Sequence, residues 1–251
     1  MRGSGVDRFE EYVAALSATL GHADRDEPFR RYTTGLLLPL ERKSVEPMAA
    51  RVEPGRVSAA HQSLHHFVAK AEWSDAVLLA AVRDQVLPAM GAIEGWIVDD
   101  TGFAKKGKHS VGVGRQYCGQ LGKQDNCRVA VSLSVASSTA SLPIAYRLYL
   151  PRDWAEDPAR RTKAGVPGDL GFQTKPMIAL TQIAAALTAG VPQGVVLADA
   201  GYGADMKFQG RLLELGIDYV VGVQPTATVW PGGRGSLPWG QTVAAGCTPT
   251  T

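Results

Sequence analysis

The chain has 251 residues, of which 45% are hydrophobic and 20% charged, and its formal net charge at pH 7 is +2. This composition is typical of a globular protein with one large domain or two smaller ones, and it excludes binding to polyanions through overall charge alone. The three cysteines form no CxxC pair, so the sequence predicts neither a disulfide framework nor a zinc site and fits a reducing cytoplasm. No apolar run reaches the ~18 residues of a membrane span, and MRGSGVDRFEEY lacks an apolar signal segment, so we expect no membrane association.

Residues 6 to about 90 have the periodicity of helices. Apolar side chains fall at helical spacing before Gly21, at Phe9, Val13, Leu16 and Leu20. Ser74 has the position of a helix cap for a later run that ends before Pro88. Because no strand pattern occurs in this part, the sequence predicts an all-helical N-terminal unit over residues 1–92.

From Gly95 the pattern changes to that of a mixed α/β unit. Short apolar or alternating runs predict strands at 96–100, 129–135, 142–150, 195–199 and 219–223. Helices are predicted from a cap at Thr174 to Gly190, and from about residue 204 to Gly216. This order predicts an α/β fold over residues 93–223, with a mixed sheet flanked by helices and its first and fourth strands adjacent. Residues 224–251 are rich in Gly, Pro and Thr, which predicts an irregular or disordered tail.

Two of the predicted strands lead directly into aspartates. The run Trp96-Ile97-Val98 precedes Asp99 and Asp100, and Val195-Val196-Leu197 lies before Asp199. Carboxylates at the ends of adjacent strands repel each other unless they share a cation, and their hard oxygens suit Mg²⁺. We therefore predict that Asp100 and Asp199 form a metal site of the kind that cleaves phosphodiesters.

Asp100 is favoured over Asp99 because it directly precedes Thr101-Gly102, where we expect the strand to end in a tight turn. Asp99 then points to the opposite side of the strand. The alternative is that Asp100 and Asp199 are ordinary turn or helix-capping residues, which are common after strands.

A basic segment follows Asp99 and Asp100. Between residues 105 and 128 a single acid, Asp125, faces several cations, among them Lys105, Lys106, Lys108 and Arg115. Its position favours contact with phosphates, although a solvated basic loop has the same pattern. Trp154, in a polar insertion, either packs the insertion onto the sheet or stacks on an unpaired base.

The segments VDDTGFAKKGKHSVGVGRQYCGQLGKQDNC, YLPRDWAEDPARRTKAGVP, FQTKPMIAL and LADAGYG resemble the IS701-type transposases of bacterial insertion sequences. These belong to the DDE superfamily and have a ribonuclease-H-like core. The resemblance extends from about residue 10 to about residue 230. It implies that Asp100 and Asp199 match the first and second catalytic aspartates, and that the helical unit contributes to DNA binding.

The resemblance also implies an activity and its partners. The expected activity is DNA strand cleavage and transfer by Mg²⁺-dependent phosphoryl transfer, with Mn²⁺ as a substitute metal. The expected substrate is the double-stranded DNA of transposon ends, bound by a homodimer, and the expected location is the cytoplasm, in association with the nucleoid.

The chain departs from the family pattern at the third carboxylate. The family uses a Glu on a helix well beyond the second Asp, whereas no acidic residue follows Asp218. We therefore expect a C-terminally truncated copy that lacks this group. One alternative is a catalytically inactive DNA-binding fragment that inhibits the full-length transposase. Another is a sugar-kinase or actin-like ATPase, which would need DxGT phosphate loops where the chain has DDTGF.

Overall fold

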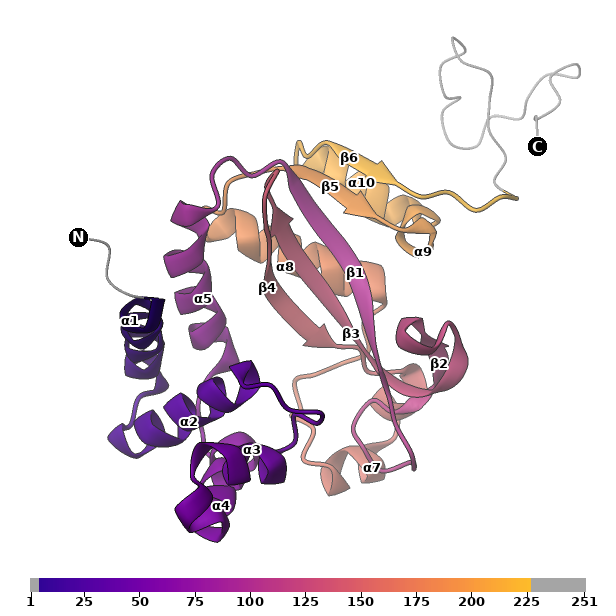
Figure 1. Ribbon diagram of the computed structural model, residues 1–251. Helices are drawn as coiled ribbons and strands as arrows, with labels where there is room; N and C mark the ends of the chain where they lie inside the picture. Colours follow the sequence, from indigo (N-terminus) through magenta and orange to yellow (C-terminus); the bar gives the residue numbers. More distant parts are fainter. Residues whose placement is uncertain (1–4, 227–251) are drawn as a thin grey trace, which may run out of the picture. The chain divides into compact units, whose positions relative to one another are not determined.

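The computed structural model of the chain describes residues 5–226 and separates into two compact units (Figure 1). The first unit ends at Gly91 and the second begins at Ala92. From residue 227 on, the predicted irregular tail lies outside the described residues. No helix within the described range is long and apolar enough to cross a bilayer.

Every regular element of the first unit, within residues 5–91, is helical. The α-helices are α1 (Gly5–Ser17), α2 (Asp26–Leu37), α3 (Val45–Val52), α4 (Val57–Ala69) and α5 (Asp75–Val86), and short 3-10 turns are η1 (Ala18–Leu20), η2 (Ala23–Arg25), η3 (Pro54–Arg56) and η4 (Leu87–Ala89). Gly21 adopts a left-handed φ of 77° and ends the first helical run, and the Ser74 hydroxyl accepts a hydrogen bond from the backbone N–H of Val77 at the start of α5. The prediction of a helical N-terminal region is confirmed.

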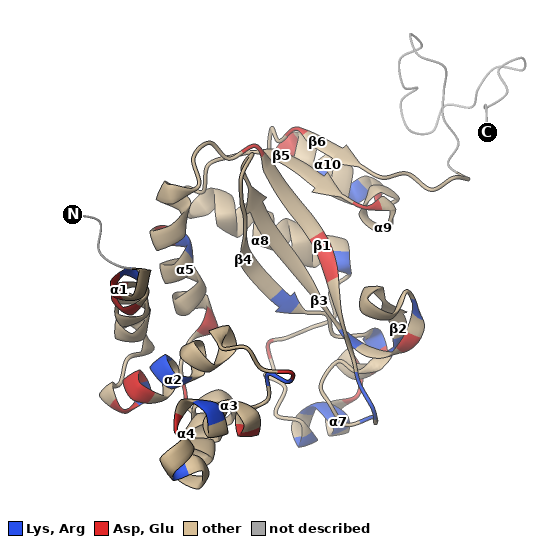
Figure 2. Ribbon diagram, in the orientation of Figure 1, with Lys and Arg blue, Asp and Glu red and all other residues tan. Residues whose placement is uncertain are grey.

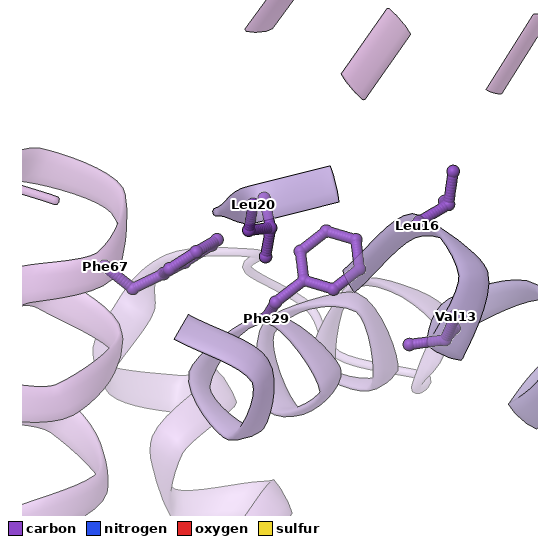
Figure 3. Packing of buried hydrophobic residues seen from close by; sticks show 5 residues of the cluster. All are labelled: Val13, Leu16, Leu20, Phe29 and Phe67. Carbon is purple, nitrogen blue, oxygen red and sulfur yellow. The ribbon is translucent and has the colours of Figure 1, made fainter. Parts of the chain in front are cut away.

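The apolar side chains predicted for the first helix meet those of later helices in a core. Val13, Leu16 and Leu20 lie with Phe29 of α2 and Phe67 of α4 in one buried cluster (Figure 3). The rings of Phe29 and Phe67 meet edge to face, with 6.0 Å between their centroids. Full burial of a side chain of this size contributes about 1.5–3 kcal/mol, so this cluster gives the unit a core of its own.

The second unit is built on a six-stranded mixed sheet. Its strands are β1 (Gly95–Ala104), β2 (Gly114–Cys118), β3 (Lys123–Ala136), β4 (Ser141–Leu148), β5 (Val195–Ala198) and β6 (Tyr219–Val221). The strand order is β2-β3-β1-β5-β6, with β4 also paired to β3. Pairings among β1 to β4 are antiparallel, whereas β1–β5 and β5–β6 are parallel.

The predicted neighbours in the sheet are confirmed. The first and fourth predicted strands are β1 and β5, and they pair in parallel from Gly95 with Val195 to Val98 with Ala198. Strand β2 was not predicted, because its five residues GRQYC do not alternate in polarity and so give no strand signal. The mixed sheet flanked by helices, after a helical N-terminal region, is consistent with the ribonuclease-H-like fold that the resemblance implies.

The helices of the second unit come after β4 and after β5. They are α6 (Arg152–Ala155), α7 (Pro158–Lys163), α8 (Lys175–Thr188), α9 (Ala200–Gly203) and α10 (Met206–Glu214). The predicted cap of α8 is confirmed, because the Thr174 hydroxyl accepts a hydrogen bond from the backbone N–H of Met177. Helix α8 packs on β3, where the buried Gln182 donates its side-chain N–H to the carbonyl oxygen of Val131 at 3.0 Å.

Two glycines allow α9 and the end of β6 to lie in backbone contact. A Cβ atom on Gly203 would stand 1.9 Å from the carbonyl oxygen of Gly222, and one on Gly222 would stand 2.7 Å from the backbone nitrogen of Ala200. Because no side chain fits between these backbones, both positions require glycine. The contact holds α9, which begins directly after Asp199, against the end of β6.

We expect Gly203→Ala to destabilise the second unit by about 1–3 kcal/mol or more, because the added methyl group overlaps backbone that must shift. Gly210→Ala is the matched control, since a Cβ there meets nothing within 4 Å and alanine favours the interior of α10 by up to ~1 kcal/mol. Urea unfolding followed by circular dichroism measures both. Equal unfolding midpoints for the two variants would contradict the close contact.

Candidate active site

Asp100 lies inside β1 and not at its end. Strand β1 loses its parallel neighbour β5 after Val98, but its antiparallel pairing with β3 continues as far as Ala104 opposite Cys127. The expected tight turn at Thr101-Gly102 is therefore wrong, because the long β3 keeps these residues extended. Asp100 is presented where one edge of β1 has become free of its neighbour.

Asp199 directly follows β5 and caps α9. Its Oδ1 accepts hydrogen bonds from the backbone N–H groups of Gly201 at 2.8 Å and Tyr202 at 3.3 Å. The helix-capping alternative is thus correct for one oxygen of this carboxylate. The other oxygen, Oδ2, has no hydrogen-bond or ion-pair partner among residues 5–226.

Tyr202 connects the two predicted aspartates. Its hydroxyl donates a hydrogen bond to Oδ1 of Asp100 at 2.7 Å, while its backbone N–H bonds to Asp199. The side chain is buried, and burial together with the charge of Asp100 raises the pKa of the Tyr202 hydroxyl far above its ordinary value. Tyr202 therefore remains a neutral donor that contacts both aspartates.

Lys175 provides the remaining partner of Asp100. Its Nζ lies 2.5 Å from Oδ2 of Asp100, and both side chains are about 30% exposed, at 28% for Lys175 and 30% for Asp100. Both oxygens of Asp100 are thus engaged, one by a neutral hydroxyl and the other by a cation. The site nevertheless remains open to solvent.

Asp99 does not share these partners. Its side chain is exposed, and its Oδ1 accepts a hydrogen bond from the backbone N–H of Asp100 at 2.7 Å. Since β1 continues through both residues, successive side chains point to opposite faces of the sheet. Asp100, and not Asp99, is therefore the residue whose side chain contacts Tyr202 and Lys175.

Sequence reasoning missed Tyr202 and Lys175. Tyr202 stands within LADAGYG, three residues after Asp199, and Lys175 lies between the cap Thr174 and Pro176. The only available signal was their place in segments that resemble the family. Their contacts with Asp100 span 102 and 75 residues of sequence, so local pattern cannot reveal them.

The donor atoms fit a hard divalent cation in type. Carboxylate oxygens of Asp100 and Asp199 are ligands that Mg²⁺ accepts, and Mg²⁺ completes its shell with water. Within residues 5–226, no group of three or more His, Cys, Asp and Glu side chains is arranged to hold a metal ion. The described part of the chain therefore offers two carboxylates and not a complete protein ligand set.

The predicted basic residues lie on an exposed loop and on β2. Lys105, Lys106 and Lys108 are exposed and form no ion pair within the described residues, and Arg115 is exposed on β2. Figure 2 shows Lys and Arg positions gathered around β2 and α7 in the second unit.

Backbone contacts hold this loop in place. The Asn126 side chain donates hydrogen bonds to the carbonyl oxygens of Lys105 and Gly107, and Arg160 of α7 donates to that of Lys108. The loop thus presents its lysine side chains while its backbone is tied to β3 and α7.

The insertion packs around Trp154. This side chain is 1% exposed, and its indole N–H donates to the carbonyl oxygen of Val113 at 2.7 Å. The guanidinium of Arg160 covers the ring at 3.7 Å from its centroid. The packing interpretation of Trp154 is confirmed, and stacking on a base is wrong because no face of the ring is accessible.

A groove of about 950 Å³ runs between α8 and α10 in the second unit. Thr174 and Gly201 line it next to the aspartates, but its other walls are largely apolar, including Met177, Leu180 and Phe208. Its charged lining residues include Asp205 and Lys207.

A pH titration tests the environment of Tyr202. We expect its hydroxyl to stay protonated when exposed tyrosines ionise near pH 10, so Tyr202→Phe leaves the native tyrosinate absorbance change unaltered.

The same shift makes stability depend on pH. The folded state holds the Tyr202 proton more tightly than the unfolded state, so this stabilisation is present below about pH 10 and decreases as pH rises above it. Tyr202→Phe removes this contribution to the alkaline loss. A smaller absorbance change in the Tyr202→Phe variant than in the unmodified chain would contradict the buried hydroxyl.

Comparison with known proteins places this chain in a family. A family model described as DDE superfamily endonuclease matches residues 15–249, which includes most of the segment expected to be irregular. The probable transposase for insertion sequence element IS701 from Microchaete diplosiphon is 32% identical over 217 residues, or 86% of this chain and 53% of that protein. The chain thus spans about half the length of this curated relative. The extent of the family match shows that the chain belongs to the DDE superfamily endonucleases.

Proposed function

We propose that the chain supplies the catalytic core of an insertion-sequence transposase, which cleaves and joins DNA strands by divalent-metal-dependent phosphoryl transfer. The observation that carries the proposal is the link through Tyr202, which contacts Asp100 with its hydroxyl and Asp199 with its backbone. Two carboxylates from adjacent parallel strands are thereby held at one edge of the sheet. The family match supports the same chemistry.

In this proposal Asp100 and Asp199 hold Mg²⁺, with Mn²⁺ as a substitute. The bound ion would activate an attacking water or 3′-hydroxyl and stabilise the leaving oxygen. Asp199 contributes the oxygen that is free of hydrogen bonds within the described residues, while its other oxygen keeps its place through α9. Tyr202 orients Asp100 without adding charge.

The proposed DNA-binding surface consists of β2 and the loop that carries Lys105, Lys106 and Lys108. Lys105, Lys106, Lys108 and Arg115 are proposed phosphate contacts, supported by their exposure and by the fixed backbone of the loop. The helical unit over residues 1–92 is the proposed further DNA-binding region. Double-stranded transposon ends, a homodimer on the DNA and action at the nucleoid complete the proposal, by analogy with the family.

The alternative is an inactive DNA-binding form that inhibits an intact transposase. It is favoured by one observation, which is that no group of three or more His, Cys, Asp and Glu side chains within residues 5–226 is arranged to hold a metal ion. Two carboxylates alone position metal ions poorly, and misplacement by about 1 Å can cost ~100-fold in rate. The two functions make opposite predictions for cleavage.

A plasmid-nicking assay separates them. We expect the chain to nick supercoiled DNA with Mg²⁺ or Mn²⁺, and Asp100→Asn or Asp199→Asn to reduce the rate by about 100-fold or more, because each removes a charged metal ligand. Asp218→Asn is the matched control, since Asp218 is exposed before β6 and bonds to β5 only through its backbone oxygen. DNA binding without nicking in either metal would favour the inactive form.

Salt dependence tests the proposed phosphate contacts. We expect the triple variant Lys105→Gln, Lys106→Gln, Lys108→Gln to bind DNA more weakly and to reduce the slope of log affinity against log salt by about 3, since each phosphate contact contributes ~0.9. Lys207→Gln on α10 is the control for loss of a surface charge. Fluorescence anisotropy with a duplex at several salt concentrations measures both, and an unchanged slope in the triple variant would refute the contact assignment.

A further inference from the structure

Lys175 has no role in stabilising its own helix. It is the first residue of α8, at the end where the helix dipole is positive and disfavours a cation, and α8 has no acidic residue in its first turn. Its Nζ instead contacts Oδ2 of Asp100 across 75 residues of sequence. A cation at this position is therefore explained by the site and not by the helix.

The contact places a cation on the proposed metal ligand. Nζ of Lys175 lies 2.5 Å from Oδ2 of Asp100, which is an oxygen that a divalent ion at this carboxylate would use. The other oxygen is engaged by the Tyr202 hydroxyl. An ammonium group and a divalent ion repel each other at such separations, even where solvent reduces the interaction.

A second surface keeps the ammonium group near the site. Nζ of Lys175 lies 5.5 Å from the centroid of the Tyr149 ring, at a distance typical of a cation–π contact. Phe172 meets the edge of this ring, and the guanidinium of Arg152 covers Phe172 at 4.4 Å. The insertion after β4 thus builds an aromatic surface beside Asp100.

We propose that Lys175 is a positioning residue that neutralises and holds Asp100 in the metal-free site and competes with the divalent cation for it, an inference that rests on the proposed metal-binding function of Asp100. When the metal ion binds, the ammonium group of Lys175 leaves Oδ2 of Asp100 and remains near Tyr149. The backbone of Lys175 stays in place, because this residue directly follows the N-cap of α8. Lys175 then adds a positive charge next to the metal, where a DNA phosphate must approach.

The direction in which Mn²⁺ affinity changes when the Lys175 charge is removed tests the competition. Binding of Mn²⁺ is measured by the loss of the free-ion electron paramagnetic resonance signal, without DNA or turnover. We expect Lys175→Met, which keeps the apolar stem and removes the charge, to bind Mn²⁺ at least about tenfold more tightly than the unmodified chain. A purely structural role predicts the reverse, because a disordered Asp100 binds metal more weakly.

Matched variants exclude general charge effects. Lys123→Met removes a lysine that is also ion-paired, with Asp125 at 3.3 Å, and should leave Mn²⁺ affinity unchanged. Lys175→Arg retains the cation and should bind Mn²⁺ as the unmodified chain does or more weakly. This variant keeps the test decisive if Lys175→Met fails to fold, because tighter binding by Lys175→Arg would overturn the proposal.

The outcomes distinguish this inference from the proposed function. Asp100→Asn should weaken Mn²⁺ binding and abolish the effect of Lys175→Met in the double variant. If Asp100→Asn leaves Mn²⁺ affinity unchanged, the proposed metal site itself is wrong. If Asp100→Asn weakens binding but Lys175→Met in a folded protein does not strengthen it, the metal site stands and the competition is refuted.

Discussion

The end of parallel pairing between β1 and β5 is the constraint on which the site depends. The pairing of the two strands ends at Val98 and Ala198, and each strand leads into a segment that contains an aspartate. β5 turns into α9 at Asp199, whereas β1 stays extended on β3 and carries Asp100 past the end of its neighbour. The position of both aspartates just beyond the last β1–β5 pair is therefore a consequence of sheet register.

Charge compensation explains why this register is tolerated. Carboxylates near each other repel, and each one here accepts hydrogen bonds from its surroundings. Asp199 receives backbone N–H groups of α9, and Asp100 receives the Tyr202 hydroxyl and the Lys175 ammonium. The Gly203–Gly222 backbone contact keeps α9, and with it Tyr202, against the sheet. Backbone packing and hydrogen bonding thus both determine the positions of Asp100 and Asp199.

Local pattern was sufficient for the elements whose signals are periodic or apolar. It predicted the helical first unit, the adjacency of β1 and β5 and the cap at Thr174, and it offered the packing of Trp154 as one of two alternatives. It failed where partners far away in sequence decide the outcome. The continuation of β1 through Thr101-Gly102 depends on the length of β3, and the roles of Lys175 and Tyr202 depend on contacts that only the folded chain creates.

Asp199 shows that an ordinary structural role and a functional one need not exclude each other. One oxygen caps α9, as aspartates after strands commonly do, and this fixes the direction of the carboxylate. The second oxygen has no partner in the described range, so the cap orients a free ligand atom without consuming it. Asp100 differs, because both its oxygens are engaged and one partner must leave before a metal ion can bind. In the proposed metal site, Asp199 therefore offers an oxygen without a partner in the described range, whereas Asp100 would first have to lose the contact with Lys175.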